Sequence, residues 1–202
     1  MMKQAKEGML TLLFMDASHF VMGCDFLGYI YGTMRRFIRT YSGRKRYNVL
    51  GALNFVSKKV STVSNDAYIT ASEVCDLLIK VAAEYAGKPI YIVLDNARYQ
   101  KCAIVAELAN QLGIKLVFIP PYSPNLNLIE RLWKHVKGKL RTKYYDVFDD
   151  FQKKIDSIVN DTDKNDIAVI NRLIGEKVQL FGDSLIARSN AVHSCKIEKQ
   201  AA

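Results

Sequence analysis

The chain has 202 residues, of which 50% are hydrophobic and 24% charged, a composition that excludes a mostly disordered protein. No apolar run approaches the ~20 residues that a transmembrane helix needs, so we expect no membrane span. Lys and Arg outnumber Asp and Glu by 29 to 20, and this net charge of +9 favours an acidic partner, with nucleic acid ahead of a membrane surface.

The first part of the chain predicts strands followed by one well-marked helix. Apolar, β-branched and aromatic runs predict strands at residues 10–16, 28–32 and 47–57. A helix is expected over residues 70–85, because Thr70 and Glu73 match a capping box and apolar residues then recur at helical spacing.

The second part predicts strands and helices in alternation. Strands are expected at residues 90–94 and 115–119, and helices at 101–112 and about 127–140. The tail beyond residue 146 has a helical apolar face made of Val147, Phe151, Ile155, Ile158 and Val159. Alternating strands and helices imply parallel pairing, whereas the opening strands can pair as antiparallel hairpins. We therefore expect an α/β fold with a mixed sheet flanked by helices.

Basic residues gather in two runs that contain no acid. The runs comprise Arg35, Arg36, Arg39, Arg44, Lys45 and Arg46, then Arg131, Lys134, Lys137, Lys139, Arg141 and Lys143. A single charge run is usually a solvated face, but two runs flanking one site would indicate a nucleic-acid surface. The stretch 146–166 is acidic and suggests no role.

The cysteines and histidines predict neither disulfides nor a zinc site. The four cysteines are far apart and form no CxxC pair, and the three histidines are scattered. Free thiols in a reducing compartment are the simplest interpretation, so we expect a soluble cytoplasmic protein.

Three carboxylates stand out by their positions. Asp16 ends one predicted apolar strand and Asp95 directly follows another, so each is expected at a wet strand end, and Glu130 lies in the first turn of a predicted helix. Taken singly, each is more commonly a turn or cap residue. Converging acids would repel one another unless a cation neutralised them, and carboxylates alone favour Mg²⁺ or Mn²⁺. Together they indicate hydrolysis or transfer at phosphorus with two ions ~3.5–4 Å apart.

Three stretches of the sequence resemble one known family. Residues 93–99 are VLDNARY, residues 120–127 are PPYSPNLN followed by IERLW at 129–133, and residues 47–54 are YNVLGALN. They resemble the IS630 family of bacterial transposases, in the IS630/Tc1/mariner superfamily of DDE transposases. Thirty-four residues, 96 to 129, separate Asp95 from Glu130, which is that family's spacing, and Asp16 falls where its first acid belongs.

The resemblance implies a fold, an activity and a site. The fold would be RNase H-like, with a mixed five-stranded sheet flanked by helices and a short helical C-terminal tail. Asp16, Asp95 and Glu130 would be both the catalytic and the metal-binding residues. Asp16 would bridge two Mg²⁺ or Mn²⁺ ions, and the other two acids would each complete one site. The reaction would be cleavage of DNA at the transposon terminal inverted repeats and strand transfer into target DNA at TA.

The resemblance also implies an organisation of the chain. Residues 1–145 would form the catalytic domain and residues 146–202 a helical extension, while the family's N-terminal helix-turn-helix domain would be absent. A homodimer is expected because two DNA ends must be held together, and the protein would be bacterial and associated with the nucleoid.

Four positions depart from the family pattern without removing an acid of the triad. Ala17 stands in place of Glu, Gln100 of His, Asn125 of Asp and Leu128 of Pro. Asn125 and Leu128 alter the loop that leads to Glu130.

Candidate DNA contacts lie near the acids and in the first basic run. They are Asn96, Arg131, Lys134, Lys137, Arg35, Arg36, Arg44 and Arg46. Lys134 and Lys137 follow Glu130 by four and seven residues and so share its helix face. Asn96 could orient a ligand but is at least as often a turn former. Trp133 is expected to pack in the core.

Two alternatives to a transposase stay open from the sequence. One is a catalytically idle DNA-binding fragment, which would keep the basic runs but cut nothing. The other is an RNase H-like nuclease of another kind, which would cleave hybrids or junctions in place of transposon ends.

Overall fold

The computed structural model describes residues 1–22, 45–120, 126–140 and 145–160. The strands are β1 (Thr11–Val21), β2 (Arg46–Asn54), β3 (Val60–Asn65), β4 (Ile90–Leu94) and β5 (Ile114–Phe118). The helices are α1 (Met2–Lys6), α2 (Ala71–Glu84), α3 (Ala103–Gln111), α4 (Ile129–Leu140) and α5 (Phe148–Asn160).

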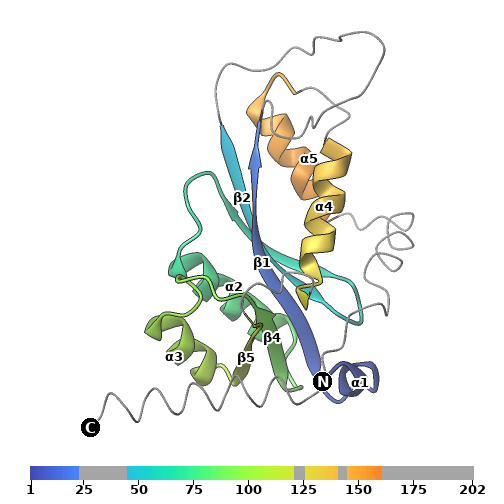
Figure 1. The fold of residues 1–202 in the computed structure, drawn as a ribbon, viewed down its shortest axis with the longest axis vertical. Coiled ribbons are helices and arrows are strands. Elements are labelled where there is room, and N and C mark those ends of the chain that lie inside the picture. Colours follow the sequence, from blue (N-terminus) through green and yellow to red (C-terminus); the bar gives the residue numbers. More distant parts are fainter. Residues whose placement is uncertain (23–44, 121–125, 141–144, 161–202) are drawn as a thin grey trace.

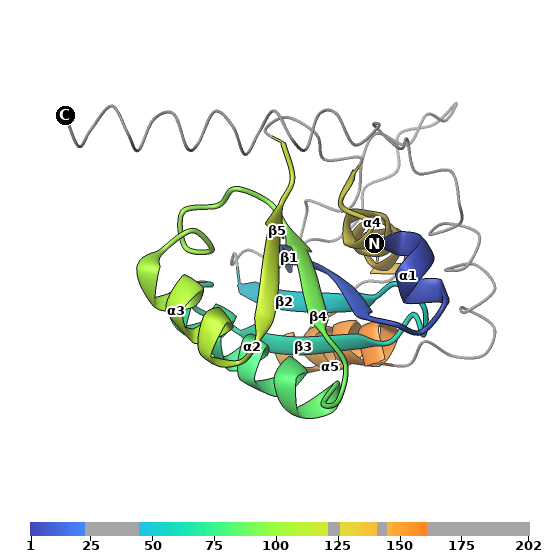
Figure 2. The ribbon, with the colours of Figure 1, turned by 90° about the horizontal axis from the view of Figure 1, so that it is seen from below.

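The strands form one mixed sheet in the order β3-β2-β1-β4-β5. β1 pairs with β2, and β2 with β3, in antiparallel ladders, whereas β4 lies parallel to both β1 and β5. Helices α2 and α3 cover one face of this sheet, and α4 and α5 cover the other (Figure 1). Seen from below, α2 and α3 lie on one side of β4 and β5, and α4 lies on the other (Figure 2). The predicted α/β fold with a mixed five-stranded sheet is therefore confirmed.

Alternation along β1 divides the core between the two faces. Leu12, Phe14 and Phe20 belong to the core on the side of α4 and α5, while Leu13 and Met15 belong to the core beneath α2 and α3. Successive side chains of a strand point to opposite faces, so each side of β1 contributes to a separate apolar cluster.

Local signals in the sequence account for two of the helices. The capping box of α2 is present, because Thr70 accepts a hydrogen bond from the helix backbone and the Glu73 side chain bonds back to the backbone of Thr70. The predicted apolar face of α5 is buried at Phe151, Ile155 and Ile158, although Val147 is exposed and lies outside the helix.

Helix α5 is tied to the sheet by a buried hydroxyl. The Tyr47 hydroxyl lies 2.8 Å from Asp156 Oδ1 of α5 and 2.8 Å from Ser64 Oγ of β3. Burial and the adjacent Asp156 carboxylate raise the pKa of Tyr47 to about 12. The apolar face of α5 belongs to the same core as that of α4 and β1, and the division of the chain at residue 145 stays a prediction.

The structure corrects two expectations about strands. β1 does not stop at Asp16 but continues to Val21, because it keeps pairing with β2 after the parallel ladder with β4 has ended. The predicted strand 47–57 ends at Asn54, whose side chain accepts hydrogen bonds from the backbone of Val56 and Ser57 and so forms the turn to β3. β3 was not predicted, because its Ser, Thr and Asn residues lack an apolar pattern. The strand predicted at 28–32 lies outside the described residues.

Candidate active site

Strand register brings two of the three acids together. β1 and β4 pair in parallel from Thr11–Ile90 to Phe14–Val93. Two residues further along the same register, Asp16 stands level with Asp95, the first residue after β4. Asp95 therefore lies at a strand end, as predicted, whereas Asp16 lies in the middle of the longer strand β1.

The third acid approaches from the helix layer. Asp16 has the same parity as Phe14 and Phe20, whose side chains pack beneath α4, so its carboxylate points to that face of the sheet. Glu130 is exposed in the first turn of α4. The fold thus directs Asp16 toward the helix that carries Glu130.

A glycine lets α4 approach the sheet beside Asp16. Gly51 of β2 is the cross-strand partner of Asp16. A Cβ at Gly51 would lie 2.9 Å from Trp133 Cη2, closer than real Cβ atoms come, and 3.2 Å from Ile129 Cδ1, which would have to shift slightly. Trp133 is buried in the core, as predicted. The Trp133 indole therefore packs against the backbone of Gly51, directly across from Asp16.

Two side chains after β4 are fixed by hydrogen bonds. Asp95 Oδ1 accepts a bond from the backbone N–H of Ala97 at 3.1 Å, which holds the carboxylate in a turn. The Asn96 amide donates to the carbonyl of Ile119 at 2.7 Å and so ties the end of β4 to the end of β5. Asn96 thus holds two strand ends together, and its contact with DNA stays a prediction.

Burial and neighbouring carboxylates raise the pKa of two of the three acids. Burial first, and then the carboxylates of Asp95 and Glu130, raise the pKa of Asp16 to about 7, although the backbone N–H of Ala17 and the charge of Lys137 act in the opposite direction. Burial, followed by the charge of Asp95, raises the pKa of Glu130. The expectation that Asp16 stands at a wet edge with its charge unburied is wrong, because β1 continues past it and α4 covers it.

The chemistry of these groups suits a hard divalent cation. Within the described residues, no three His, Cys, Asp or Glu side chains are gathered closely enough to ligate one ion. The acids are nevertheless all carboxylates, and each of Asp16 and Glu130 has its pKa raised by another acid of the set. A bound Mg²⁺ or Mn²⁺ would offset that repulsion, so the residue types suit such an ion, and a ligand set of Asp16, Asp95 and Glu130 stays a prediction.

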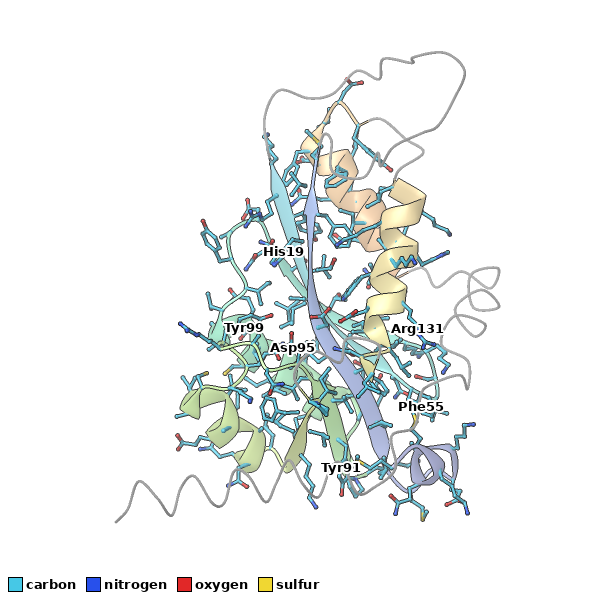
Figure 3. All side chains as sticks on the ribbon, in the orientation of Figure 1. His19, Phe55, Tyr91, Asp95, Tyr99 and Arg131 are labelled. Atoms are coloured by element: carbon cyan, nitrogen blue, oxygen red, sulfur yellow. The ribbon has the colours of Figure 1, made fainter. Side chains whose placement is uncertain are left out.

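The candidate DNA contacts fall at different distances from the acids. Lys137 is half-buried, acts on the charge of Asp16, and places its Nζ 5.7 Å from the centre of the Phe20 ring. Lys134 is exposed on the same helix and Arg131 is half-buried (Figure 3). Arg46 pairs with Val21 at the far end of β1, five residues or ~16 Å from Asp16, so the fold does not bring it to the acids. Arg35, Arg36 and Arg44 lie outside the described residues, as does Asn125.

Two further residues lie at this site that the sequence pattern did not single out. Burial and the charges of Asp95 and Asp16 raise the pKa of Tyr99 to about 12, so its hydroxyl keeps its proton beside the acids. Tyr99 and Asp95 are labelled near each other in Figure 3. Asn127 is buried and donates a hydrogen bond from Nδ2 to the carbonyl of Met15, the residue before Asp16, at 3.0 Å. Its position in the PPYSPNLN stretch was a signal, but the partner was not visible in the sequence.

Comparison with known families matches most of the chain. Residues 11–152 match a family described as DDE superfamily endonuclease, and no curated protein sequence matches. No helix among the described residues is long and apolar enough to cross a membrane.

Comparison with solved structures supports the same fold. The Mos1 strand transfer complex matches with a TM-score of 0.62 and 12% identity over 90% of this chain and 59% of that chain. The Mos1 transposase paired-end complex with the left transposon end matches with a TM-score of 0.57 and 11% identity, over 90% of this chain and 60% of that one. The HTLV-2 integrase catalytic core in complex with magnesium matches with a TM-score of 0.47 and 16% identity, over 74% and 88%. The chain thus has the RNase H-like fold of the Mos1 transposase structures and spans about 60% of the length of the Mos1 chains.

Proposed function

The chain belongs to the DDE superfamily endonucleases, and on that premise we propose that it is the catalytic domain of a transposase of the IS630 family. Its reaction would be metal-dependent cleavage of DNA at the terminal inverted repeats, followed by transfer of the freed 3′ end into target DNA at TA. The catalytic and metal-binding residues would be Asp16, Asp95 and Glu130.

The carrying observation is the mutual electrostatic effect of these acids. Asp16 and Asp95 stand level on neighbouring strands, and the charges of Asp95 and Glu130 both raise the pKa of Asp16. Such an arrangement destabilises the protein without a cation, and an acid whose pKa is raised by neighbouring acids is typical of a functional site.

The residues of this chain supply ligands and charge. Mg²⁺ or Mn²⁺, when bound, would activate a water molecule and stabilise the leaving oxygen at phosphorus. The turn N–H of Ala97 orients Asp95 by holding one carboxylate oxygen. Lys137, which acts on Asp16 from α4, is suited to contact a phosphate beside the acids.

The basic residues of α4 suggest a path for the DNA backbone. Arg131, Lys134 and Lys137 follow Glu130 along one helix, so a DNA backbone at the acids would pass over this helix. Support for a DNA partner also comes from the Mos1 structures, which are strand transfer and paired-end complexes with a transposon end. A homodimer that holds two ends, and association with the bacterial nucleoid, belong to this proposal.

The remaining details rest on the sequence motifs. The PPYSPNLN and IERLW stretches favour the IS630 family and TA targets within the superfamily. We keep the proposed division into a catalytic domain at 1–145 and a helical extension at 146–202.

Nicking of supercoiled plasmid tests the proposal. The chain should nick plasmid with Mn²⁺ or Mg²⁺, and EDTA or Asp95→Asn should abolish nicking. Binding of DNA without metal-dependent nicking would contradict the proposed activity and favour the idle DNA-binding fragment. Preference for RNA–DNA hybrids or junctions over transposon ends would favour another RNase H-like nuclease.

A further inference from the structure

We propose that Asn127 is a positioning residue that fixes the distance between Asp16 and Glu130, and this inference rests on the proposed metal-dependent function of those acids. Its side chain bonds to the backbone of Met15, next to Asp16, and its backbone carbonyl accepts a bond from the N–H of Glu130. Asn127 is 2% exposed, so these bonds are shielded from water.

The first bond fills a gap in the sheet. The backbone N–H of Thr11 donates to the carbonyl of Pro89, on the side of β4. Alternate residues of a strand direct their backbone groups to the same side. The carbonyl of Met15, four residues after Thr11, therefore also points toward β4. β4 ends at Leu94, and the Asn127 amide bonds the Met15 carbonyl in place of a further strand. Asn127 therefore occupies the slot at the end of the β1–β4 ladder, where the strand register places Asp16 and Asp95.

The second bond starts the helix. The backbone N–H of Glu130 donates to the carbonyl of Asn127 at 3.2 Å, in the turn that opens α4. One residue thus links the carbonyl just before Asp16 to the N–H of Glu130. Moving Asn127 would shift the backbone of Glu130 relative to Asp16.

The Met15 carbonyl requires a hydrogen-bond donor at position 127. The Met15 carbonyl can only accept, so it requires the Nδ2 group of an amide, and an Asp of the same shape offers no donor when ionised. A buried carbonyl left without its donor is costly, so the helix start should move to let water reach it. The contact of Trp133 with Gly51 would still hold the body of α4 on the sheet, and the displacement would be concentrated at Glu130.

The test compares Asn127→Asp and Asn127→Ala with Tyr47→Phe. Tyr47→Phe removes another buried helix-to-sheet hydrogen bond, at Asp156 of α5, away from the acids. Mn²⁺ binding is measured by calorimetry, nicking is measured as a function of Mn²⁺ concentration, and thermal unfolding is followed in EDTA.

We expect both Asn127 variants to weaken Mn²⁺ binding roughly 10- to 100-fold, as loss of a group that orients a metal ligand does, and to raise the Mn²⁺ concentration for half-maximal nicking. Tyr47→Phe should lower the melting temperature about as much as the Asn127 variants do. Its Mn²⁺ affinity should stay at the wild-type value.

Two results would overturn the inference, and they differ in what else they overturn. Wild-type Mn²⁺ affinity in Asn127→Asp, while the unaltered chain binds Mn²⁺ and nicks DNA, would overturn the role of Asn127 alone. Absence of Mn²⁺ binding and of nicking in the unaltered chain would overturn both this role and the proposed function.

Discussion

The two faces of β1 carry polar groups of opposite character. On the face toward α2, His19, Asn48 and Asn65 form one row across three strands, with His19 Nδ1 2.6 Å from Asn48 Oδ1 and Asn48 Nδ2 3.1 Å from Asn65 Oδ1. On the face toward α4, Asp16 faces other acids that raise its pKa.

Polar groups that satisfy one another's hydrogen bonds stabilise the fold, whereas polar groups that repel one another are suited to bind a ligand. The Asn48 amide uses its second N–H on the Ala67 carbonyl, so this buried side chain is fully satisfied. The acids on the other face oppose one another and gain from an added cation. Removing the polar group should therefore lower stability at Asn48 and raise it at Asp16.

The largest effect is expected for Asp16→Asn. This variant should lose metal-dependent nicking by more than roughly 100-fold, since it removes a proposed ligand itself and not merely a group that orients one. In EDTA at pH 8 the same variant should be more stable than the unaltered chain by about 2–4 kcal/mol, because it removes a buried charge. Plasmid nicking and urea unfolding measure the two changes, and a less stable Asp16→Asn would contradict the comparison.

The stability difference between the unaltered chain and Asp16→Asn should depend on pH. The pKa of Asp16 is raised from 3.8 to about 7 in the folded protein, so folding takes up a proton between these values. The stability contributed by protonated Asp16 is thus fully present below pH ~4 and is lost as pH rises through 7. Urea unfolding in EDTA at pH 4, 5.5 and 8 should show a difference that grows with pH, and a constant difference would count against a raised pKa.

On the opposite face, Asn48→Ala should destabilise the protein by about 2–3 kcal/mol. It leaves the Ala67 carbonyl and the Asn65 side chain without the donor that they share. Mn²⁺ affinity should stay at its wild-type value, because Asn48 lies on the far side of the sheet from the acids. Calorimetry with Mn²⁺ checks this point, and a large loss of affinity would show that the two faces are coupled.

Gly51→Ala should affect the acid face with a smaller loss of stability, about 1–3 kcal/mol from overpacking against Trp133. Since the new methyl group would push α4 away from Asp16, Mn²⁺ binding should weaken as well. Gly138→Ala is the matched control, because a Cβ there meets nothing within 4 Å. Equal Mn²⁺ affinity in both variants would contradict the role of close helix packing.

The smallest effect is expected for Lys137→Ala. Loss of one phosphate contact should weaken DNA binding uniformly across sequences and lower the slope of log affinity against log salt by about one. Fluorescence anisotropy with a DNA duplex at several salt concentrations measures the slope. An unchanged slope would remove Lys137 from the proposed DNA surface.

Much of the fold could be predicted from local sequence. The α2 helix has its capping box and apolar spacing within one short segment, and β4, α3 and β5 alternate as expected. These features depend on neighbours in the chain, so pattern and propensity suffice. The polar strand β3 was missed because its place in the sheet depends on pairing with β2 and not on its own side chains.

The candidate site was predicted only as a set of three acids. Their residue types are a property of the sequence, and so is the suitability of carboxylates for Mg²⁺ or Mn²⁺. The position of Asp16 within β1, its alignment with Asp95 and its pKa of about 7 required the strand register and the covering helix. The bond from Asn127 to Met15 joins residues 112 positions apart, and the contact of Gly51 with Trp133 is also distant in the chain. Sequence determined which groups are present, whereas the tertiary structure decided how far apart they stand, because separation and burial arise from contacts between distant segments.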